Sequence, residues 1–596
     1  MTTATEQPKL VLDGDTEFLG VDQRTHPAAL PPGLGADARN KRFHERKAAD
    51  RPGITIRPLG AYEPAVVGTS AWTPYYRPQG ATVFRDPEST QWTIVVAAGA
   101  VWGFTMHQTG IRIPLPSGVT LSADEDAEYE FTQAFDKLLL WRGESATPLV
   151  LNTINTGFEE ITQTTSGAGN GTGTLTIPNS NRASFIQNRV AACSGDNIYI
   201  SDAQNLSRYS LLNAFRINDG SDDRLLTVVP FGDTSAVAFK TKSIHLLGGL
   251  VPDSSGNFSA ATRTTITRQH GLVAPLAVTQ VGRDLFYMST DGLTSVQLTE
   301  ENNVRGTDVP LSWPMKALWE RINWRAAHRS QLAYWDSKLY WAVPVDNYPV
   351  PNVVAVYDLR TRNWCGTDEG DALAFGVKRF LPQFFNGQLR LFFLDWLGLV
   401  RLYEEGFDDW RQGDFLLNED GVTRLTTEFG LPRLTEDLDI YSFSVRGRFT
   451  SRGYTGGSPL RKRFGTVRPT LETWNPTASI AALTDGQNES KPLRPSSRTR
   501  SRTRYTTHAT TPWDVTNAND DHGKAHREDY SLVLGAGLTL GTGVRLDRHQ
   551  TFDPPRSVNR TGRHLQLEFT NTTGRCDLRS LVIEAAPAEA SQVTHT

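Results

Sequence analysis

A repeat of about fifty residues runs through most of this 596-residue chain and constrains its fold more than any other feature. Each unit has an apolar stretch, a turn rich in Gly, Asn, Asp or Ser, and a second apolar stretch. Successive units are spaced by 45, 52, 47, 48, 54 and 50 residues. The seven units begin near Trp92, Lys137, Arg189, Ala236, Asp284, Lys338 and Gln388.

Val, Ile, Tyr, Phe and Trp are enriched in the apolar stretches, and this composition favours β-strands. Gly, Asn and Asp at the turns supply the positive φ angles that tight hairpins need. A period of about 40 to 50 residues with several strands per unit is typical of a β-propeller blade. One sheet cannot bury both of its faces alone, whereas a ring buries each face on a neighbour. The sequence therefore predicts a mainly β fold with a six- or seven-bladed β-propeller, and unrelated hairpins in a sandwich are the alternative.

The two ends of the chain lack this repeat. Residues 1–60 have few apolar runs and many prolines, so we expect an extended N-terminal arm that packs on something else, such as a neighbouring subunit. The propeller is expected over residues 61–430. Residues 153–181, rich in Gly, Thr and Asn, break its rhythm and predict a long projecting loop. Residues 431–596 alternate like strands with a different spacing and predict a separate C-terminal β-rich domain.

The best helix candidate is the segment Pro310–Ala327, where Ser312 can serve as the N-cap. Apolar side chains in this segment recur at i, i+3, i+4 and i+7, so they lie on one face of a helix. These positions are Met315, Leu318, Trp319 and Ile322. We interpret this stripe as core rather than as a ligand site.

Charge and cysteine content exclude some classes of protein. The formal net charge of −4 argues against general coating of nucleic acid, although residues 431–596 carry +6 and the first 430 residues carry −10. This asymmetry predicts either a solvated surface of mixed sign or an interface with an acidic partner. Cys193, Cys365 and Cys576 are too few and too far apart for a disulfide framework or a zinc cluster, so we expect buried reduced thiols. We expect neither a signal peptide nor membrane insertion.

Motifs of common active sites are missing from the sequence. It has no Gly-x-Ser-x-Gly elbow, no His-Glu-x-x-His and no phosphate-binding loop. The segment "STDGLT" (Ser289–Thr294) is similar to a sialidase Asp box, but an Asp-Gly turn explains it equally well. The run "SADEDAEYE" (Ser122–Glu130) holds five carboxylates, and we expect a solvated loop or a repulsive face there. The sequence therefore predicts no catalytic residues, no metal site and no cofactor.

The clearest charge feature is "RPSSRTRSRTRYTTH" (Arg494–His508). Alternation with Ser and Thr puts its arginines on one face if the segment is a strand. The four residues are Arg498, Arg500, Arg502 and Arg504. They are candidate contacts to DNA in a channel or to an acidic surface of a neighbouring subunit. An exposed strand or a disordered loop is the alternative.

Several segments, taken in their order along the chain, carry a family resemblance. They are "NRVAACSGDNIYISDAQN" (Asn188–Asn205), "VVPFGDTSAVAFKTKSIHLLGG" (Val228–Gly249), "RQHGLVAPLAVTQVGRDLFYMSTDGLTSVQ" (Arg268–Gln297), "YWAVPVDNYPVPNVVAVYDLRTRNWCG" (Tyr340–Gly366) and, near the N-terminus, "FLGVDQRTHPAALPPGLGADARNKRF" followed by "RPGI". Together, over roughly residues 15–405, they resemble the tail nozzle of podoviruses, the short-tailed bacteriophages. This protein is also called the tail hub or DNA-stabilisation protein.

This resemblance implies a structural virion protein and no enzymatic activity. The expected assembly is a homohexameric ring below the portal and the adaptor, or head-to-tail connector. It would continue the channel for packaged double-stranded DNA, retain that DNA until ejection, and anchor tail spikes, fibres or a needle. The expected location is the short tail of the virion, after synthesis in the host cytoplasm. The region beyond Gly430 matches no family.

The alternative function is a propeller-based tail protein that binds or cleaves glycans, as a lectin or a depolymerase does. Cleavage requires two carboxylates that face each other near the propeller axis. Glycan binding requires exposed aromatic platforms, for which Trp396 and Trp410 are candidates.

Overall fold

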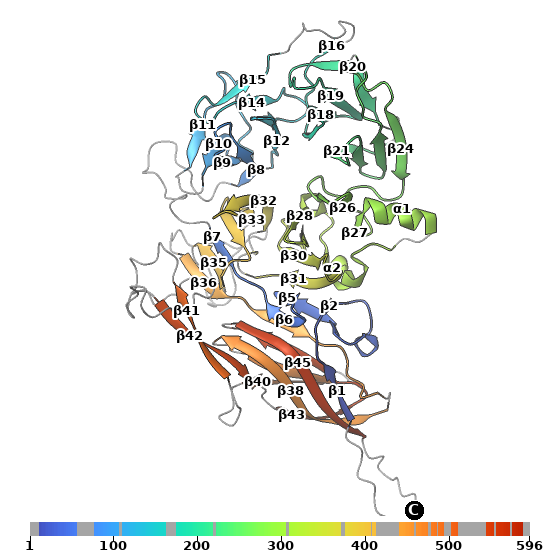
Figure 1. Cartoon of the computed structure of the whole chain (residues 1–596), viewed down its shortest axis with the longest axis vertical. Helices are drawn as coiled ribbons and strands as arrows, with labels where there is room; N and C mark the ends of the chain where they lie inside the picture. The colour runs from blue at the N-terminus through green and yellow to red at the C-terminus, as the bar shows by residue number, and fades with distance from the viewer. Residues whose placement is uncertain are drawn as a thin grey trace, which may run out of the picture.

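The computed structural model describes residues 11–56, 77–105, 110–124, 126–162, 174–217, 222–254, 256–305, 309–370, 373, 376–406, 408–412, 440–457, 460–474, 478–484, 487–493, 502–509, 544–552, 556–572 and 575–587. Strands dominate these residues and helices are short, so the predicted mainly β class is confirmed. In Figure 1 the strands between Pro78 and Tyr403 gather in an upper body, and the orange and red strands form a lower one together with the blue N-terminal strands.

Seven antiparallel sheets follow one another between Pro78 and Tyr403 in the described part of the chain. Most have four strands, and the fifth has three followed by a helix. Their strands are β8 (Pro78–Arg85), β9 (Gln91–Ala97), β10 (Ala100–Phe104) and β11 (Ile111–Ile113); β12 (Glu130–Ala134), β13 (Lys137–Trp141), β14 (Leu149–Leu151) and β15 (Phe158–Glu160); β16 (Thr174–Leu175), β17 (Arg182–Ile186), β18 (Arg189–Ser194), β19 (Asn197–Ser201) and β20 (Tyr209–Arg216); β21 (Leu225–Pro230), β22 (Ala236–Lys240), β23 (Ile244–Gly248) and β24 (Thr262–Thr267); β25 (Val278–Val281), β26 (Asp284–Met288) and β27 (Leu293–Ser295); β28 (Gln331–Trp335), β29 (Lys338–Val343), β30 (Val353–Asp358) and β31 (Asn363–Asp368); and β32 (Val377–Phe385), β33 (Gln388–Asp395) and β34 (Val400–Tyr403).

The repeat units predicted from the sequence coincide with these sheets. Six units form the two middle strands of one sheet, from β9 and β10 in the first sheet to β33 and β34 in the seventh, and the fifth unit forms the last two strands, β26 and β27, of its three-stranded sheet. In the third sheet, Ser194 pairs with Asn197 across the turn, and Gly195 there has φ +58°. The strand and hairpin predictions are therefore confirmed for all seven units.

Alternate residues of the middle strands pack on different neighbouring sheets. In β9, Ile94 and Val96 belong to the apolar core shared with the second sheet, whereas Val95 and Ala97 belong to the core shared with the seventh. Both faces of the strand are buried, and this explains why its apolar run is continuous instead of alternating.

One edge strand of each sheet contacts the corresponding strand of the next sheet, except between the fourth and fifth sheets. β8 contacts β12, β12 contacts β17, β17 contacts β21, β25 contacts β28, β28 contacts β32, and β32 contacts β8 again. The fourth and fifth sheets share an apolar core. Side-chain amides add two-point links between neighbouring sheets: Gln133 donates to the carbonyl oxygen of Arg85 at 2.9 Å and accepts from its N–H at 3.2 Å. Such links satisfy backbone groups that the edge of a sheet leaves without partners.

The N-terminal segment supplies the outer strand of the seventh sheet. Strand β7 (Ile54–Ile56) pairs with β34, so that Ile54 lies opposite Tyr403. The sheet order is β32, β33, β34, β7. A strand from before the first sheet therefore completes the last one.

The rest of the N-terminal segment is also built into sheets of its own chain. Its strands are β1 (Val11–Asp15), β2 (Gly20–Val21), β3 (Leu34–Gly35), β4 (Asp37–Arg39), β5 (Lys41–His44) and β6 (Lys47–Asp50). Strand β4 pairs with β31 of the sixth sheet, and β1 and β6 pair with a C-terminal strand. Residues 11–56 thus form strands of several sheets, unlike the extended arm expected over residues 1–60. Residues 1–10 and 57–60 lie outside the described residues. Polar composition hid these strands, because several of their charged residues are buried in ion pairs.

The C-terminal strands belong to three sheets, one of which continues the sixth sheet of the upper body and one of which is the pair β35 (Asp408–Gln412) and β36 (Ile440–Ser444). The other strands are β37 (Gly447–Thr450), β38 (Lys462–Trp474), β39 (Ala478–Thr484), β40 (Gln487–Leu493), β41 (Arg502–Ala509), β42 (Val544–Phe552), β43 (Arg556–Gly562), β44 (Gln566–Asn571) and β45 (Arg575–Pro587). One sheet extends from β31 through β4 to β37, β44, β39 and β40, and another includes β38, β45, β6 and β5. The predicted C-terminal β-rich region thus shares a sheet with the ring.

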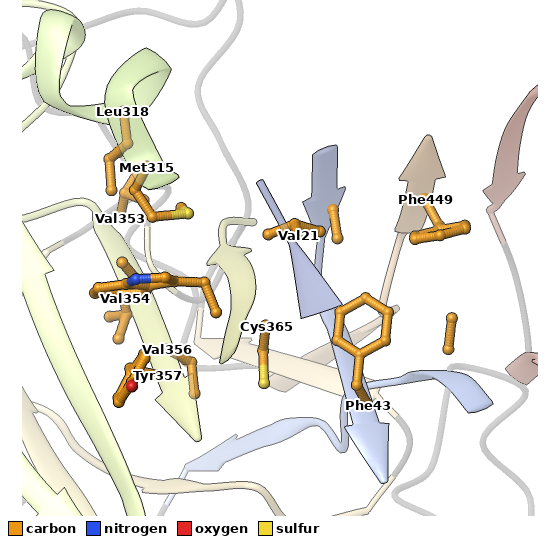
Figure 2. Packing of buried hydrophobic residues seen from close by; sticks show 14 of the residues in the cluster. Val21, Phe43, Met315, Leu318, Val353, Val354, Val356, Tyr357, Cys365 and Phe449 are labelled. Carbon is orange, nitrogen blue, oxygen red and sulfur yellow. The ribbon is translucent and has the colours of Figure 1, made fainter. Parts of the chain in front are cut away.

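A single apolar core joins the two bodies. Val21 and Phe43 of the N-terminal segment lie between Cys365 of β31 and Phe449 of β37, as Figure 2 shows. Close backbone approach at this junction requires Gly366, which has φ +96°. A Cβ atom there would lie only 2.2 Å from the carbonyl oxygen of Ala38 in β4.

The helices depart from the prediction. The segment Pro310–Ala327 contains only a 3-10 turn, Trp313–Met315, and the short helix α2 (Lys316–Arg321). Ser312 makes no side-chain cap bond to that turn and instead accepts a hydrogen bond from the Leu293 N–H at 3.0 Å. The apolar stripe is core as predicted, since Met315, Leu318 and Ile322 are buried and Trp319 packs against the same cluster. Helix α1 (Val296–Arg305) was not predicted, because Val296 and Leu298 alternate with a polar residue as in a strand.

The predicted projecting loop over residues 153–181 is partly strand. Its first part contains β15 at the edge of the second sheet, and its last part contains β16, which pairs with β20 of the third. Residues 163–173 lie outside the described residues.

Candidate functional site

A cavity of about 490 Å³ lies where the starts of the first strands converge. Residues from all seven sheets, or from the segments that lead into them, line it. Seven of them carry charge at neutral pH: Glu128, Glu130, Glu144, Arg182, Arg224, Lys378 and Arg379. Its volume falls in the range of small-molecule pockets, about 300–1,000 Å³. We call it the axial cavity.

One carboxylate joins three sheets at the axial cavity. Glu130, at the start of β12, accepts hydrogen bonds from Arg379 of β32 at 2.6 and 3.2 Å and from Arg182 of β17 at 2.8 Å. All three side chains are mostly buried. Burial alone would raise the pKa of Glu130, but Arg379 and Arg182 outweigh it and lower that pKa. Glu130 therefore stays ionised and cannot serve as the general acid that glycoside cleavage requires.

The expectation for the acidic run Ser122–Glu130 is therefore corrected at its end. The Glu130 side chain is 12% exposed and lies between two arginines instead of in solvent, and Glu128 lines the axial cavity. A run of carboxylates in a sequence does not reveal which of them begins an innermost strand. The first position of each such strand is the usable signal for the site, since Glu130 and Arg182 both occupy it.

Lys378 is held beside the cavity by an acid and an aromatic ring. Its Nζ lies 3.5 Å from Glu128 and 4.3 Å from the ring centroid of Trp396. Burial and the nearby Arg329 lower the pKa of Lys378, although Glu128 opposes them. Trp396 is only 5% exposed, so it cannot be the glycan platform considered for it. The side chain of Trp410, the other candidate, lies outside the described residues.

A group of Ser, His and Asp residues in the fourth sheet is similar to a catalytic triad in composition but not in connectivity. Asp223 accepts from the hydroxyl of Ser243, and Ser243 Oγ lies 2.8 Å from His245 Nε2. Because the serine gives its proton to Asp223, His245 must donate to Ser243 and cannot act as its base. Ser243 is also buried, at 3% exposure. This group stabilises the sheet.

The "STDGLT" segment is a turn, as the Asp-Gly interpretation predicted. Ser289 Oγ donates to the carbonyl oxygen of Gly292 at 3.0 Å and accepts from the Asp291 N–H at 3.2 Å. Asp291 pairs with His270. Within the described ranges, no three His, Cys, Asp or Glu residues are grouped as metal ligands, and no helix is long and apolar enough to cross a membrane.

The predicted arginine strand is only partly described. Arg502 and Arg504 belong to β41, and its register with β42 places Arg502 opposite Thr551 and Arg504 opposite His549. Arg498 and Arg500 lie outside the described residues. The expected strand is confirmed for its second half, and its role in contacts stays a prediction.

A buried charge network, which was not predicted from the sequence, joins the upper body to the C-terminal sheets. Arg42 of β5 makes two hydrogen bonds to Asp368 of β31, at 2.8 and 2.6 Å, and one to Glu404 at 2.6 Å. Arg51 makes two hydrogen bonds to Asp409 of β35, at 2.8 and 2.7 Å. We call these five residues the junction network. They come from three separate parts of the chain, 42–51, 368 and 404–409, so the network fixes the two bodies relative to each other.

Water is largely excluded from the junction network. The Arg51 side chain is 0% exposed, and the Arg42 side chain 4%. Burial raises the pKa of the neighbouring Tyr403, and the charge of Asp368 raises it further. Loss of one partner from a buried ion pair typically costs about 3–5 kcal/mol, because the other charge stays buried. The network therefore penalises any separation of the two bodies.

Comparison with known proteins identifies no family. No family model matches the chain, and no curated protein matches it. Three solved structures are similar at a low level: PorZ of the type-IX secretion system of Porphyromonas gingivalis (14% identity, TM-score 0.33, 66% of this chain and 44% of PorZ), virginiamycin B lyase from Staphylococcus aureus (11%, 0.33, 55% and 95%) and the AfRom2 CNH domain (9%, 0.32, 57% and 98%). The chain thus covers less than half of the PorZ length. Similarity at these TM-scores says nothing about the activity of this protein.

Proposed function

We propose that this chain is a structural protein of a short-tailed phage virion, the subunit of a homohexameric tail nozzle. In this proposal its seven sheets are the blades of a seven-bladed β-propeller, and the strand β7 closes the ring. The nozzle continues the DNA channel below the portal and adaptor, retains packaged DNA, and anchors spikes, fibres or a needle. The chain has no catalytic role.

The observation that carries the proposal is the position of the segments that resemble the nozzle family. Asn188–Asn205 contains the hairpin of β18 and β19, and Val228–Gly249 contains β22 and β23. Arg268–Gln297 contains β25 to β27, and Tyr340–Gly366 contains β30. The segments thus take corresponding places in four consecutive sheets, and the N-terminal one contributes strands at the junction. A resemblance that follows the architecture is better support than four unconnected matches.

The junction network supports a mechanical role. A nozzle must keep its shape while DNA is held behind it, and buried ion pairs with two-point geometry resist displacement in every direction. In the axial cavity, Glu130 is committed to Arg182 and Arg379. Cys193 also lines this cavity, but burial raises the pKa of its thiol to about 12, so it is not an activated nucleophile.

The DNA conduit cannot be the axial cavity of one subunit. The ion pairs of Glu130 lie at a cavity of about 490 Å³, a volume that suits a small molecule. A DNA duplex does not fit there, because the major groove of B-DNA alone is about 12 Å wide. The proposal therefore puts the conduit on the six-fold axis, between subunits. Residues 431–596, with a net charge of +6, are the candidates to line it.

Electron microscopy of the purified protein and of the virion tests the proposal. We expect a six-fold ring with an open axial channel below the portal. A monomer that depolymerises a capsular polysaccharide would overturn it in favour of the glycan-cleaving alternative. A monomer that binds polysaccharide without cleaving it would favour the lectin alternative.

The arginine strand allows a separate test in the virion. We expect simultaneous Arg498→Ser, Arg500→Ser, Arg502→Ser and Arg504→Ser to impair assembly or DNA retention. The matched variant with four lysines keeps the charge and should retain DNA, because phosphate neutralisation is not sequence-specific. If the serine variant assembles and retains DNA normally, the strand is only surface.

A further inference from the structure

The axial cavity has a small excess of positive charge, because its lining holds four cations and only three carboxylates, Glu128, Glu130 and Glu144. Glu130 is one carboxylate, and it is shared by the two guanidinium groups of Arg182 and Arg379. Lys378 and Glu128 form a pair that is neutral as a whole. The Arg182 side chain uses one of its five N–H donors on Glu130, so further donors stay available.

Arg224 adds a cation at the same cavity. It lines the cavity from the segment before β21, and no ion pair or side-chain hydrogen bond engages its guanidinium among the described residues. Its backbone is nevertheless fixed, because its N–H donates to Thr241 Oγ1 at 3.1 Å. Thr241 Oγ1 in turn donates to Asp223 at 2.9 Å. Arg224 therefore presents a charged side chain from a rigid position.

We propose that the axial cavity binds a small molecule that carries an oxyanion, a phosphate or a carboxylate, through Arg182, Arg224 and Arg379. Guanidinium groups match both anions because they donate two parallel hydrogen bonds. The cavity is large enough for a molecule of metabolite size, and its apolar lining, such as Leu225 and Leu276, can contact the uncharged part. The site does not depend on the proposed nozzle function.

Glu130 competes with the ligand in this arrangement. Its carboxylate already occupies the donors that a second oxyanion would use on Arg182 and Arg379. The ligand therefore binds mainly through Arg224 and the remaining donors of Arg182. Removal of the Glu130 charge should strengthen binding, whereas removal of Arg224 should weaken it. These opposite directions distinguish a specific site from general attraction to a positive surface.

The test is isothermal titration calorimetry on the full chain at low salt, with inorganic phosphate and glucuronate in separate arms and neutral glucose as the control ligand. We expect saturable binding of at least one anion and none of glucose. Preference for phosphate would identify a phosphate-bearing ligand, and preference for glucuronate a carboxylate-bearing one. Absence of binding of both anions at tens of millimolar would overturn the proposal.

Two variants and a matched control complete the test. Arg224→Ala should weaken anion binding about tenfold or more, because it removes a charge-assisted interaction. Glu130→Gln should strengthen it about tenfold. Arg112→Ala removes an exposed arginine on the outer strand β11 and should leave affinity unchanged. Arg224 has no described side-chain partner, so its variant should fold normally, as circular dichroism can check. Equal affinities of Arg224→Ala and Arg112→Ala would overturn the assignment even if Glu130→Gln failed to fold.

Discussion

The junction network predicts a large loss of stability when Asp409 is replaced by Ala. Asp409 accepts two hydrogen bonds from Arg51, at 2.8 and 2.7 Å, and one from the Ile54 N–H at 3.0 Å. Burial alone would lower the pKa of Arg51, but Asp409 and Asp368 outweigh it and raise that pKa. A guanidinium is not deprotonated in proteins, so Arg51 stays charged in the variant even without Asp409. A buried charge that loses its partner costs about 3–5 kcal/mol of the free energy of unfolding.

The structure places the expected loss near the lower end of this range. After the substitution, Arg51 Nε still donates to Asn40 Oδ1 at 2.9 Å, and Asp368 lies 3.8 Å away. We therefore expect Asp409→Ala to lower the free energy of unfolding by about 3 kcal/mol. Urea unfolding followed by tryptophan fluorescence and circular dichroism measures it, and separation of the two signals would indicate that the two bodies unfold independently.

A surface ion pair supplies the control for this prediction. Lys316 and Glu320 lie 3.6 Å apart with more than half of each side chain exposed, so Glu320→Ala should cost about 0.5 kcal/mol or less. The double variant Arg51→Met with Asp409→Leu removes both charges and should recover most of the loss. The reasoning is refuted if Asp409→Ala costs no more than Glu320→Ala, or if the double variant is less stable than Asp409→Ala.

Three further predictions follow from the fold and the cavity. Gly366→Ala should lower the free energy of unfolding by more than Gly387→Ala. Both glycines have positive φ angles, +96° and +77°, but only a Cβ at position 366 would meet a neighbouring backbone atom. Equal losses of stability in urea unfolding would contradict this prediction. The unmodified chain should be more stable than Glu130→Gln, and this advantage should be fully present above pH 4.5, the ordinary pKa of the carboxyl group. It should decline as pH falls through the lowered pKa of Glu130. An advantage unchanged down to pH 3 in urea titrations would contradict the ion pairs of Glu130 with Arg182 and Arg379. A thiol reagent at pH 8 should modify no cysteine of the folded chain and three cysteines after denaturation. Burial raises the pKa of all three thiols, that of Cys193 to about 12 and that of Cys365 to about 11. Fast labelling of the folded chain would contradict their burial.

The repeated hairpins could be predicted because their strands are buried on both faces. A strand such as β9 or β29 must then carry a continuous apolar run, and its turn must adopt positive φ angles. Both requirements leave a local signal in the sequence. The first and last strands of the sheets carry more polar residues, so their pairing could be inferred only from the architecture.

The axial cavity and the junction network could not be predicted, since they depend on contacts between distant residues. Arg42 and Asp368 are separated by 326 positions, and no local pattern links them. Charged residues in a short segment usually indicate solvent exposure, and this rule fails for Lys41, Arg42 and Arg51 because their partners are buried with them. The N-terminal strands were missed for the same reason.

Strand β7 has a consequence for synthesis of the protein on the ribosome. Its residues 54–56 are synthesised early, whereas its partner strand β34 ends at Tyr403 and is synthesised much later. At about 5–20 residues per second, the early strand waits on the order of tens of seconds for its partner. During that interval the edges of the nascent sheets are open to pairing with other chains. The cell must therefore either shield this intermediate or complete the chain before the sheets meet their neighbours.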